Sequence, residues 1–84
     1  MQNNPYSIQD FVIRTLESFG ALVEQKEYAL AEVLVPDVLA QRFNGKNMLL
    51  LAFDYEVAQE NESSEFVTFG SYILDEVTRL ALSK

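Results

Sequence analysis

Two residue types that carry much of protein chemistry are missing from this chain, which contains no cysteine and no histidine. Without cysteine, neither a disulfide framework nor a thiolate metal site can form. Without histidine, the chain lacks the commonest general base and the commonest metal ligand. The serine, threonine and tyrosine hydroxyls therefore have no histidine to activate them. We predict a protein that is not an enzyme, with no catalytic residue, metal ligand or cofactor.

Basic residues are also scarce, because six Lys and Arg face thirteen Asp and Glu, for a net charge of −7. Lys and Arg form no cluster in the sequence, and an acidic surface repels a phosphate backbone, so we expect no direct binding of nucleic acid. The first residues show neither the basic start nor the apolar stretch of a signal peptide. No apolar run is long enough for a membrane span. We therefore expect a cytoplasmic protein without a membrane partner.

The remaining composition predicts one small globular domain over residues 1–84. Hydrophobic residues make up 49% of the chain, including six Phe and four Tyr, which is enough for a core. No internal repeat and no low-complexity tract divides the sequence.

The most apolar stretch runs from Met48 to Phe53, six residues long and preceded by Asn44-Gly45. This length is short for a helix and suits a strand covered on both faces. Beyond it, apolar and acidic residues alternate as far as Val57, which is the period of a strand. We therefore predict a central strand over Asn47–Val57.

Helices are predicted near both ends. At the first, Ser7 is a candidate N-cap with Asp10 at the third helical position, Tyr6 and Phe11 occupy the staple positions, and an apolar stripe follows. Gly20 is suited to end this helix, which we place at Ser7–Phe19. The last helix is expected over Tyr72–Leu82, capped by Ser71 or Thr68, with an ion pair between Asp75 and Arg79.

Residues 21–35 allow two interpretations. One is a β-hairpin with strands Ala21–Gln25 and Tyr28–Val35 around a turn at Lys26-Glu27, in which Glu32 interrupts an apolar face and suggests a sheet edge. The other is a helix, because Ala, Leu, Glu, Gln and Lys are strong helix formers. We favour the hairpin, although no Asn-Gly or Asp-Gly marks its turn.

A short helix follows the hairpin. Pro36 fits its first position, Val38, Leu39 and Phe43 are expected to face inward, and Asn44-Gly45 ends it. If the central strand were parallel to the preceding one, this helix would be a right-handed crossover.

The predicted fold class is therefore α+β, a small two-layer domain in the order α-β-β-α(short)-β-α. A three-stranded sheet would carry two amphipathic helices mainly on one face. Such a sheet leaves two edges and one poorly covered face, and is often completed by another protein. We expect a protein partner or a homodimer.

Three groups of residues are candidates for function. Asp54 and Glu56 would lie side by side on a strand, as acid–base or hard-metal sites require, although a solvated strand end is the commoner explanation. Gly70-Ser71 could present free N–H groups to an anion, although ordinary helix capping explains it as well. The aromatic residues indicate a core or an interface. Our interaction candidates are Tyr28, Leu30, Glu32, Tyr55, Gly70 and Ser71.

One family resemblance covers about the last half of the chain. Residues Leu51-Ala52-Phe53-Asp54-Tyr55-Glu56-Val57-Ala58, the acidic gap, Phe66-Val67-Thr68-Phe69-Gly70-Ser71 and the helix Tyr72–Leu82 resemble the C-terminal region of RapA-type bacterial SNF2-family ATPases. Val33-Leu34-Val35-Pro36-Asp37 fits the same region. The resemblance implies an accessory α+β module that packs on a nucleic-acid-dependent motor. Every ATPase motif is missing, and Ser71-Tyr72 stands where the family has His or Pro, so ATP binding and polymerase binding are not carried over.

The leading functional prediction is a non-enzymatic protein-interaction or accessory domain, associated with an ATPase of that type. The alternative is a small acidic chaperone of the secretion type that binds an extended cargo segment as a dimer. A carboxylate-based metal enzyme that uses Asp54 and Glu56 is a third.

Overall fold

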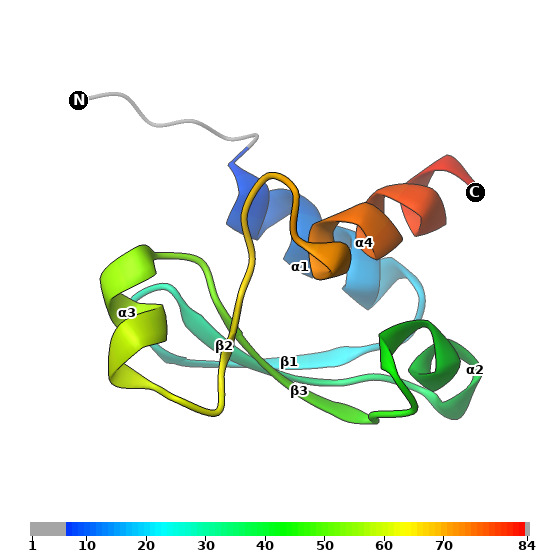
Figure 1. The fold of residues 1–84 in the computed structure, drawn as a ribbon. Helices are drawn as coiled ribbons and strands as arrows, with labels where there is room; N and C mark the ends of the chain where they lie inside the picture. The colour runs from blue at the N-terminus through cyan, green and yellow to red at the C-terminus, as the bar shows by residue number, and fades with distance from the viewer. Residues whose placement is uncertain (1–6, 84) are drawn as a thin grey trace.

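The computed structural model describes residues 7–83, which form one sheet with two long helices above it (Figure 1). In chain order the elements are α1 (Ile8–Ser18), β1 (Leu22–Glu27), β2 (Leu30–Leu34), α2 (Asp37–Ala40), the 3₁₀ turn η1 (Gln41–Phe43), β3 (Met48–Ala52), α3 (Tyr55–Glu60), β4 (Glu65–Phe66) and α4 (Tyr72–Leu82).

The sheet has four strands in the order β1-β2-β3-β4. The α+β class is confirmed, and the prediction of three strands is wrong by one, because β4 adds a two-residue parallel strand beside β3. β2 and β3 are antiparallel, so the short helix between them is not a crossover. In register, Leu22 lies opposite Leu34, and Leu34 lies opposite Met48.

Both long helices form as their end signals predict. The Ser7 hydroxyl accepts from the Asp10 N–H at 3.2 Å at the start of α1, and Gly20 follows its end with φ +100°. The Ser71 hydroxyl accepts from the Leu74 N–H at 3.3 Å at the start of α4. Tyr6, predicted as a staple residue, lies outside the described residues.

The hairpin is confirmed, but its turn lies at Tyr28-Ala29, two residues later than predicted. Ala29 has φ +56°, a left-handed conformation that alanine seldom takes and that the sequence did not signal. A bulge at Lys26 brings the strands back into register, so β1 continues to Glu27. Glu32 lies on the interior strand β2, and its predicted place at a sheet edge is wrong.

The short helix splits into α2 and the turn η1, and Pro36 is its N-cap rather than its first residue. Leu39 and Phe43 are buried as predicted, whereas Val38 is 80% exposed. Val38 and Leu39 are adjacent in α2 and point about 100° apart, so the helix that buries Leu39 turns Val38 toward water. Asn44 with φ +60° and Gly45 with φ +77° end the segment.

The predicted strand Asn47–Val57 is too long, because β3 ends at Ala52 and α3 begins at Tyr55. The Asp54 carboxylate accepts from the N–H groups of Glu56 and Val57 at 3.1 and 3.2 Å, which caps a helix. An apolar–acidic alternation of so few residues fits a capped helix as well as a strand.

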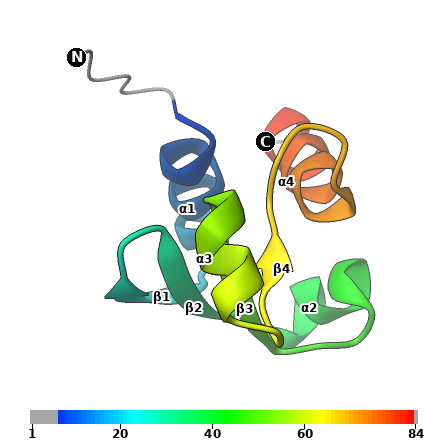
Figure 2. The ribbon, with the colours of Figure 1, turned by 60° about the vertical axis from the view of Figure 1, so that its left-hand side comes forward.

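The core lies between the sheet and the two long helices, with α1 over the β1 side and α4 over the β4 side (Figure 2). Val12 and Leu16 from α1 meet Val33, Leu49 and Leu51 from the sheet, all at most 1% exposed. Side chains alternate along a strand, so their neighbours point to the opposite face. The α3 helix stands at the end of the sheet where β3 finishes (Figure 1).

Candidate functional site

The lower face of the sheet in Figure 1 carries neither of the long helices. We call it the open face and define it by its outward-pointing residues, which are Leu22, Glu24, Glu32, Leu34, Met48 and Leu50. One row across β1, β2 and β3 is entirely apolar: Leu22 is 68% exposed, Leu34 42% and Met48 51%. The outward face of a half-covered antiparallel sheet is normally polar, so this row departs from the usual pattern. The prediction that the central strand is covered on both faces is wrong at Met48, which is exposed, and holds at Ala52, which has the same orientation and is buried.

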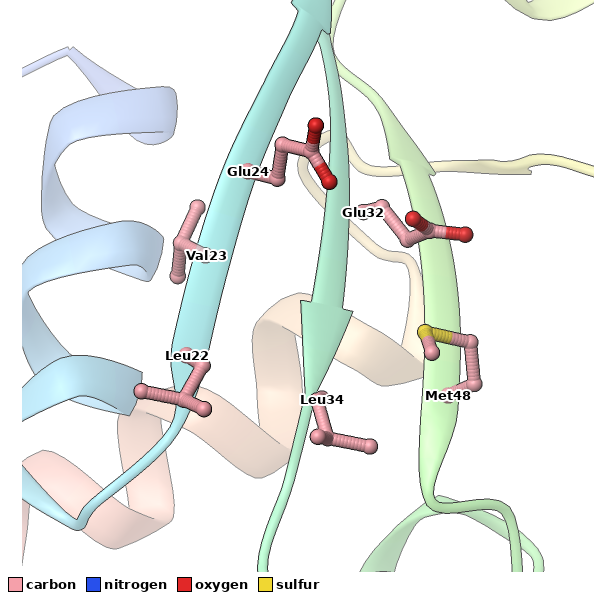
Figure 3. Close-up of a pocket in the computed structure, with 6 residues that line it drawn as sticks. All are labelled: Leu22, Val23, Glu24, Glu32, Leu34 and Met48. Atoms are coloured by element: carbon pink, nitrogen blue, oxygen red, sulfur yellow. The ribbon is translucent and has the colours of Figure 1, made fainter.

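Carboxylates border the apolar row on one side. Glu24 and Glu32 occupy the next row along the strands (Figure 3). Their carboxylates share one cation. The Lys26 Nζ lies 3.7 Å from an oxygen of each. All three side chains are at least one-third exposed, so solvent screens these contacts strongly. The row has two negative charges against one positive charge.

A third carboxylate lies beyond the opposite side of the apolar row. Asn47 Nδ2 donates to Asp37 Oδ1 at 2.9 Å and to the Val35 carbonyl at 3.1 Å, which fixes Asp37 beside the end of β2. The apolar row is therefore bordered by acidic residues on both of its sides.

Two shallow hollows lie beside the apolar row, and both are lined by Leu22 and Leu34. One of about 220 Å³ lies between the apolar row and the two glutamates, and its lining is Leu22, Val23, Glu24, Glu32, Leu34 and Met48 (Figure 3). The other, of about 330 Å³, extends to Gly20, Val35, Pro36, Asp37 and Asn47. Shallow apolar depressions of this kind suit side chains of a protein partner better than an enclosed small ligand.

The predicted interaction candidates do not come together in one place. Glu32 lies on the open face, whereas Tyr28 is exposed in the hairpin turn and Leu30 is buried. Tyr55 begins α3 and packs edge-to-face on Phe66 with ring centroids 5.9 Å apart. Of these four, only Glu32 borders the apolar row.

Gly70 and Ser71 serve the start of α4. Gly70 has φ +90°, and the Ser71 hydroxyl accepts from the N–H groups of Thr68 and Leu74 while it donates to the Thr68 carbonyl at 2.8 Å. The hydroxyl is thus occupied by the chain itself. The sequence allowed either an anion site or ordinary helix capping at Gly70-Ser71, and these hydrogen bonds are those of a helix cap.

Asp54 and Glu56 do not face each other from a strand, because Asp54 caps α3 and Glu56 lies in its first turn. The predicted side-by-side pair of carboxylates is therefore wrong. Across residues 7–83, no group of three or more acidic side chains is placed to hold a metal ion.

A polar cluster joins β4 to α4 on the side away from β1. The Tyr72 hydroxyl donates to Glu65 Oε2 at 3.3 Å and accepts from Asn44 Nδ2 at 3.2 Å, while Lys46 Nζ lies 3.5 Å from the same Glu65 oxygen. Burial, and then the Glu65 charge, raise the pKa of Tyr72 above its ordinary value of 10.0. A tyrosine with a raised pKa stays protonated at neutral pH and is a poor base there. The cluster therefore connects β4 to α4.

The other cations on this side of the molecule also have partners. Arg42 lies 3.5 Å from Glu76, and Arg79 lies 3.9 Å from the same carboxylate rather than forming the predicted pair with Asp75.

The apolar surface formed by Leu22, Leu34 and Met48 was not predicted from the sequence. Strand period places them on one face once the hairpin register is known, but their apolar character alone indicated burial. The signal that was available is that both faces of β2 and β3 carry apolar residues, while the sequence offers two long helices for one of them.

In the described part of the chain, no helix combines the length and the apolarity needed to cross a membrane. Comparisons of the sequence and structure with models of protein families, with curated proteins and with solved structures find no match.

Proposed function

We propose that this chain is a non-enzymatic protein-interaction domain whose docking surface is the open face. The observation that carries the proposal is the exposed apolar row Leu22, Leu34 and Met48, which three adjacent strands hold on a rigid support. Apolar surface left in water costs about 25 cal/mol per Å², so a partner that covers this row gains affinity from it.

The charge and the residue types agree with this proposal. The chain has no histidine or cysteine, and a net charge of −7 favours the solubility of a domain that exposes an apolar row. The similarity of residues 51–58 and 66–82 to RapA-type SNF2-family ATPases is the basis for proposing that the domain is an accessory module of such a motor. This is an inference from resemblance, and it concerns the identity of the partner rather than the surface.

The test compares partners captured by three forms of the chain. The wild type is compared with Leu22→Ser combined with Met48→Ser, which removes two of the three side chains of the apolar row, and with Leu82→Ser. Leu82 is an exposed leucine on α4, which covers the opposite face, and is therefore a matched control.

We expect a partner that both the wild type and the Leu82→Ser form retain and that the double variant loses. Circular dichroism should show that all three forms are folded. If no partner distinguishes the double variant from the control, the open face is not a docking surface and the proposal is wrong. Preference for an unfolded over a folded form of the partner would favour the acidic chaperone instead.

A further inference from the structure

Resting on the proposed function, we infer that the occupant of the open face is an amphipathic helix whose apolar stripe is flanked by basic residues. The inference concerns the chemistry of the partner. It follows from the charges that border the apolar row and from their spacing.

The border of the row is acidic on both sides. Glu24 and Glu32 share Lys26, and Asp37 stands at the other side, held by Asn47. Three other cations, Arg42, Lys46 and Arg79, lie against Glu65 or Glu76. A partner with lysine or arginine on both sides of its apolar residues would complement this border, and a partner with carboxylates there would be repelled.

A second copy of the chain is a poor match for the same reason. Two-fold symmetry would place the same patch on both sides of the contact, so an acidic border would meet an acidic border. Each copy also carries a net charge of −7, which opposes close approach.

The spacing of the acidic border favours a helix. Glu32 lies three residues before Val35, which is level with Asn47 and with the Asp37 that Asn47 holds. At about 3.3 Å per residue of strand, the two acidic sides are about 10 Å apart. Residues i and i+7 of a helix are separated by about the same distance and lie on one face, with i+3 and i+4 between them. On an extended segment, a shift of three residues would turn the second cation to the opposite face.

The helix would also repeat an arrangement that the fold already uses. The helices α1 and α4 cover the inner face of the same strands with apolar stripes. A helix on the open face would make the third layer of an α/β/α arrangement.

Three synthetic peptides test the inference, each about 18 residues or five turns of helix. The first places lysines at i and i+7 on one face of the helix, with leucines at i+3 and i+4 between them. The second replaces each lysine with glutamate. The third keeps the composition of the first but distributes the leucines around the helix. Each is titrated into isotopically labelled chain at about physiological salt, which screens unspecific attraction between exposed charges.

We expect the first peptide alone to shift the amide signals of β1, β2 and β3. Replacing Glu24→Gln and Glu32→Gln together should weaken its binding roughly three- to tenfold, since two exposed ion pairs are lost. The matched control, Glu17→Gln with Asp75→Asn, makes the same change of charge at exposed positions on α1 and α4, which cover the opposite face, and should leave binding unchanged. Leu22→Ala with Met48→Ala should also weaken binding, by roughly five- to tenfold.

The inference and the proposed function can fail separately. Equal binding of the lysine and glutamate peptides, or equal weakening by the control pair, would overturn the basic helix and leave an apolar docking surface. Concentration-dependent shifts of the same amides without peptide would identify a second copy as the occupant, which also overturns it. No shift with any of the three peptides would overturn it too, and the proposed function would then depend on the capture experiment.

Discussion

The two faces of one sheet differ in this molecule although the same strands build both. On the inner face, Val33, Leu49 and Leu51 are fully buried beneath α1 and α4. On the open face, the adjacent Leu34 and Met48 are exposed. The comparison shows that an apolar residue on a strand is suited to packing against another apolar surface. It is buried only where another element of the chain covers its face of the sheet.

The largest expected effect comes from the inner face. Leu51→Ala should lower the free energy of unfolding by about 3 kcal/mol, because it removes fully buried methyl groups and leaves a cavity. Urea unfolding followed by circular dichroism measures this effect. A loss under about 1 kcal/mol would mean that the inner face is not tightly packed, and the contrast between the faces would disappear.

Val33 and Leu34 are neighbours on β2 that point to opposite faces of the sheet. Replacing each by threonine therefore compares the two faces with the same new side chain. Val33→Thr should cost about 2 kcal/mol, because it buries a hydroxyl in the core. Leu34→Thr should cost less than about 0.5 kcal/mol, because its hydroxyl remains in water and threonine favours strands. The same unfolding assay compares them, and equal losses would show that the open face is buried.

The α4 helix covers part of the inner face, and its stability depends in part on the cap at its N-terminus. Ser71→Ala should cost about 1 kcal/mol, because its hydroxyl satisfies the Leu74 N–H at the start of the helix. Ser18→Ala is the matched control, since the Ser18 hydroxyl donates to the Thr15 carbonyl and caps no helix start. Similar losses for the two variants would contradict the assigned role of Ser71.

The smallest expected effect is a dependence of the free energy of unfolding on alkaline pH, caused by Tyr72 at the start of α4. Burial, and then Glu65, raise the folded pKa of Tyr72 above 10.0, so the unfolded chain loses this proton first. The resulting stability is present below pH 10.0 and is lost as pH rises through the folded pKa. Tyr72→Phe should therefore show a shallower fall in stability across this range. Ultraviolet titration of the tyrosines gives an independent check, and identical slopes for the two forms would contradict the raised pKa.

Local signals predicted much of the fold. Ser7, Gly20 and Asn44-Gly45 act within a few residues of themselves, and their capping and turn roles are confirmed. The α3 helix was missed because alternation in Phe53–Val57 resembled a strand, although Asp54 is an N-cap residue type. The strand β4 was missed because two residues have no period and pair only with a distant part of the chain.

The open face was the harder part to predict. Glu32 was chosen as a candidate, but Leu22, Leu34 and Met48 were not, because an apolar residue in a strand gives no sign of which side lacks a cover. Hairpin register and the position of both long helices are needed first, and both depend on contacts between residues distant in sequence.

The most direct test of the central claim is a solvent-exposure measurement by NMR with a soluble paramagnetic agent. The account predicts that the methyl signals of Leu22, Leu34 and Met48 broaden strongly in the free chain, whereas those of Leu49 and Leu51 stay sharp. Equal protection of both sets would contradict it, because the open face would then already be covered.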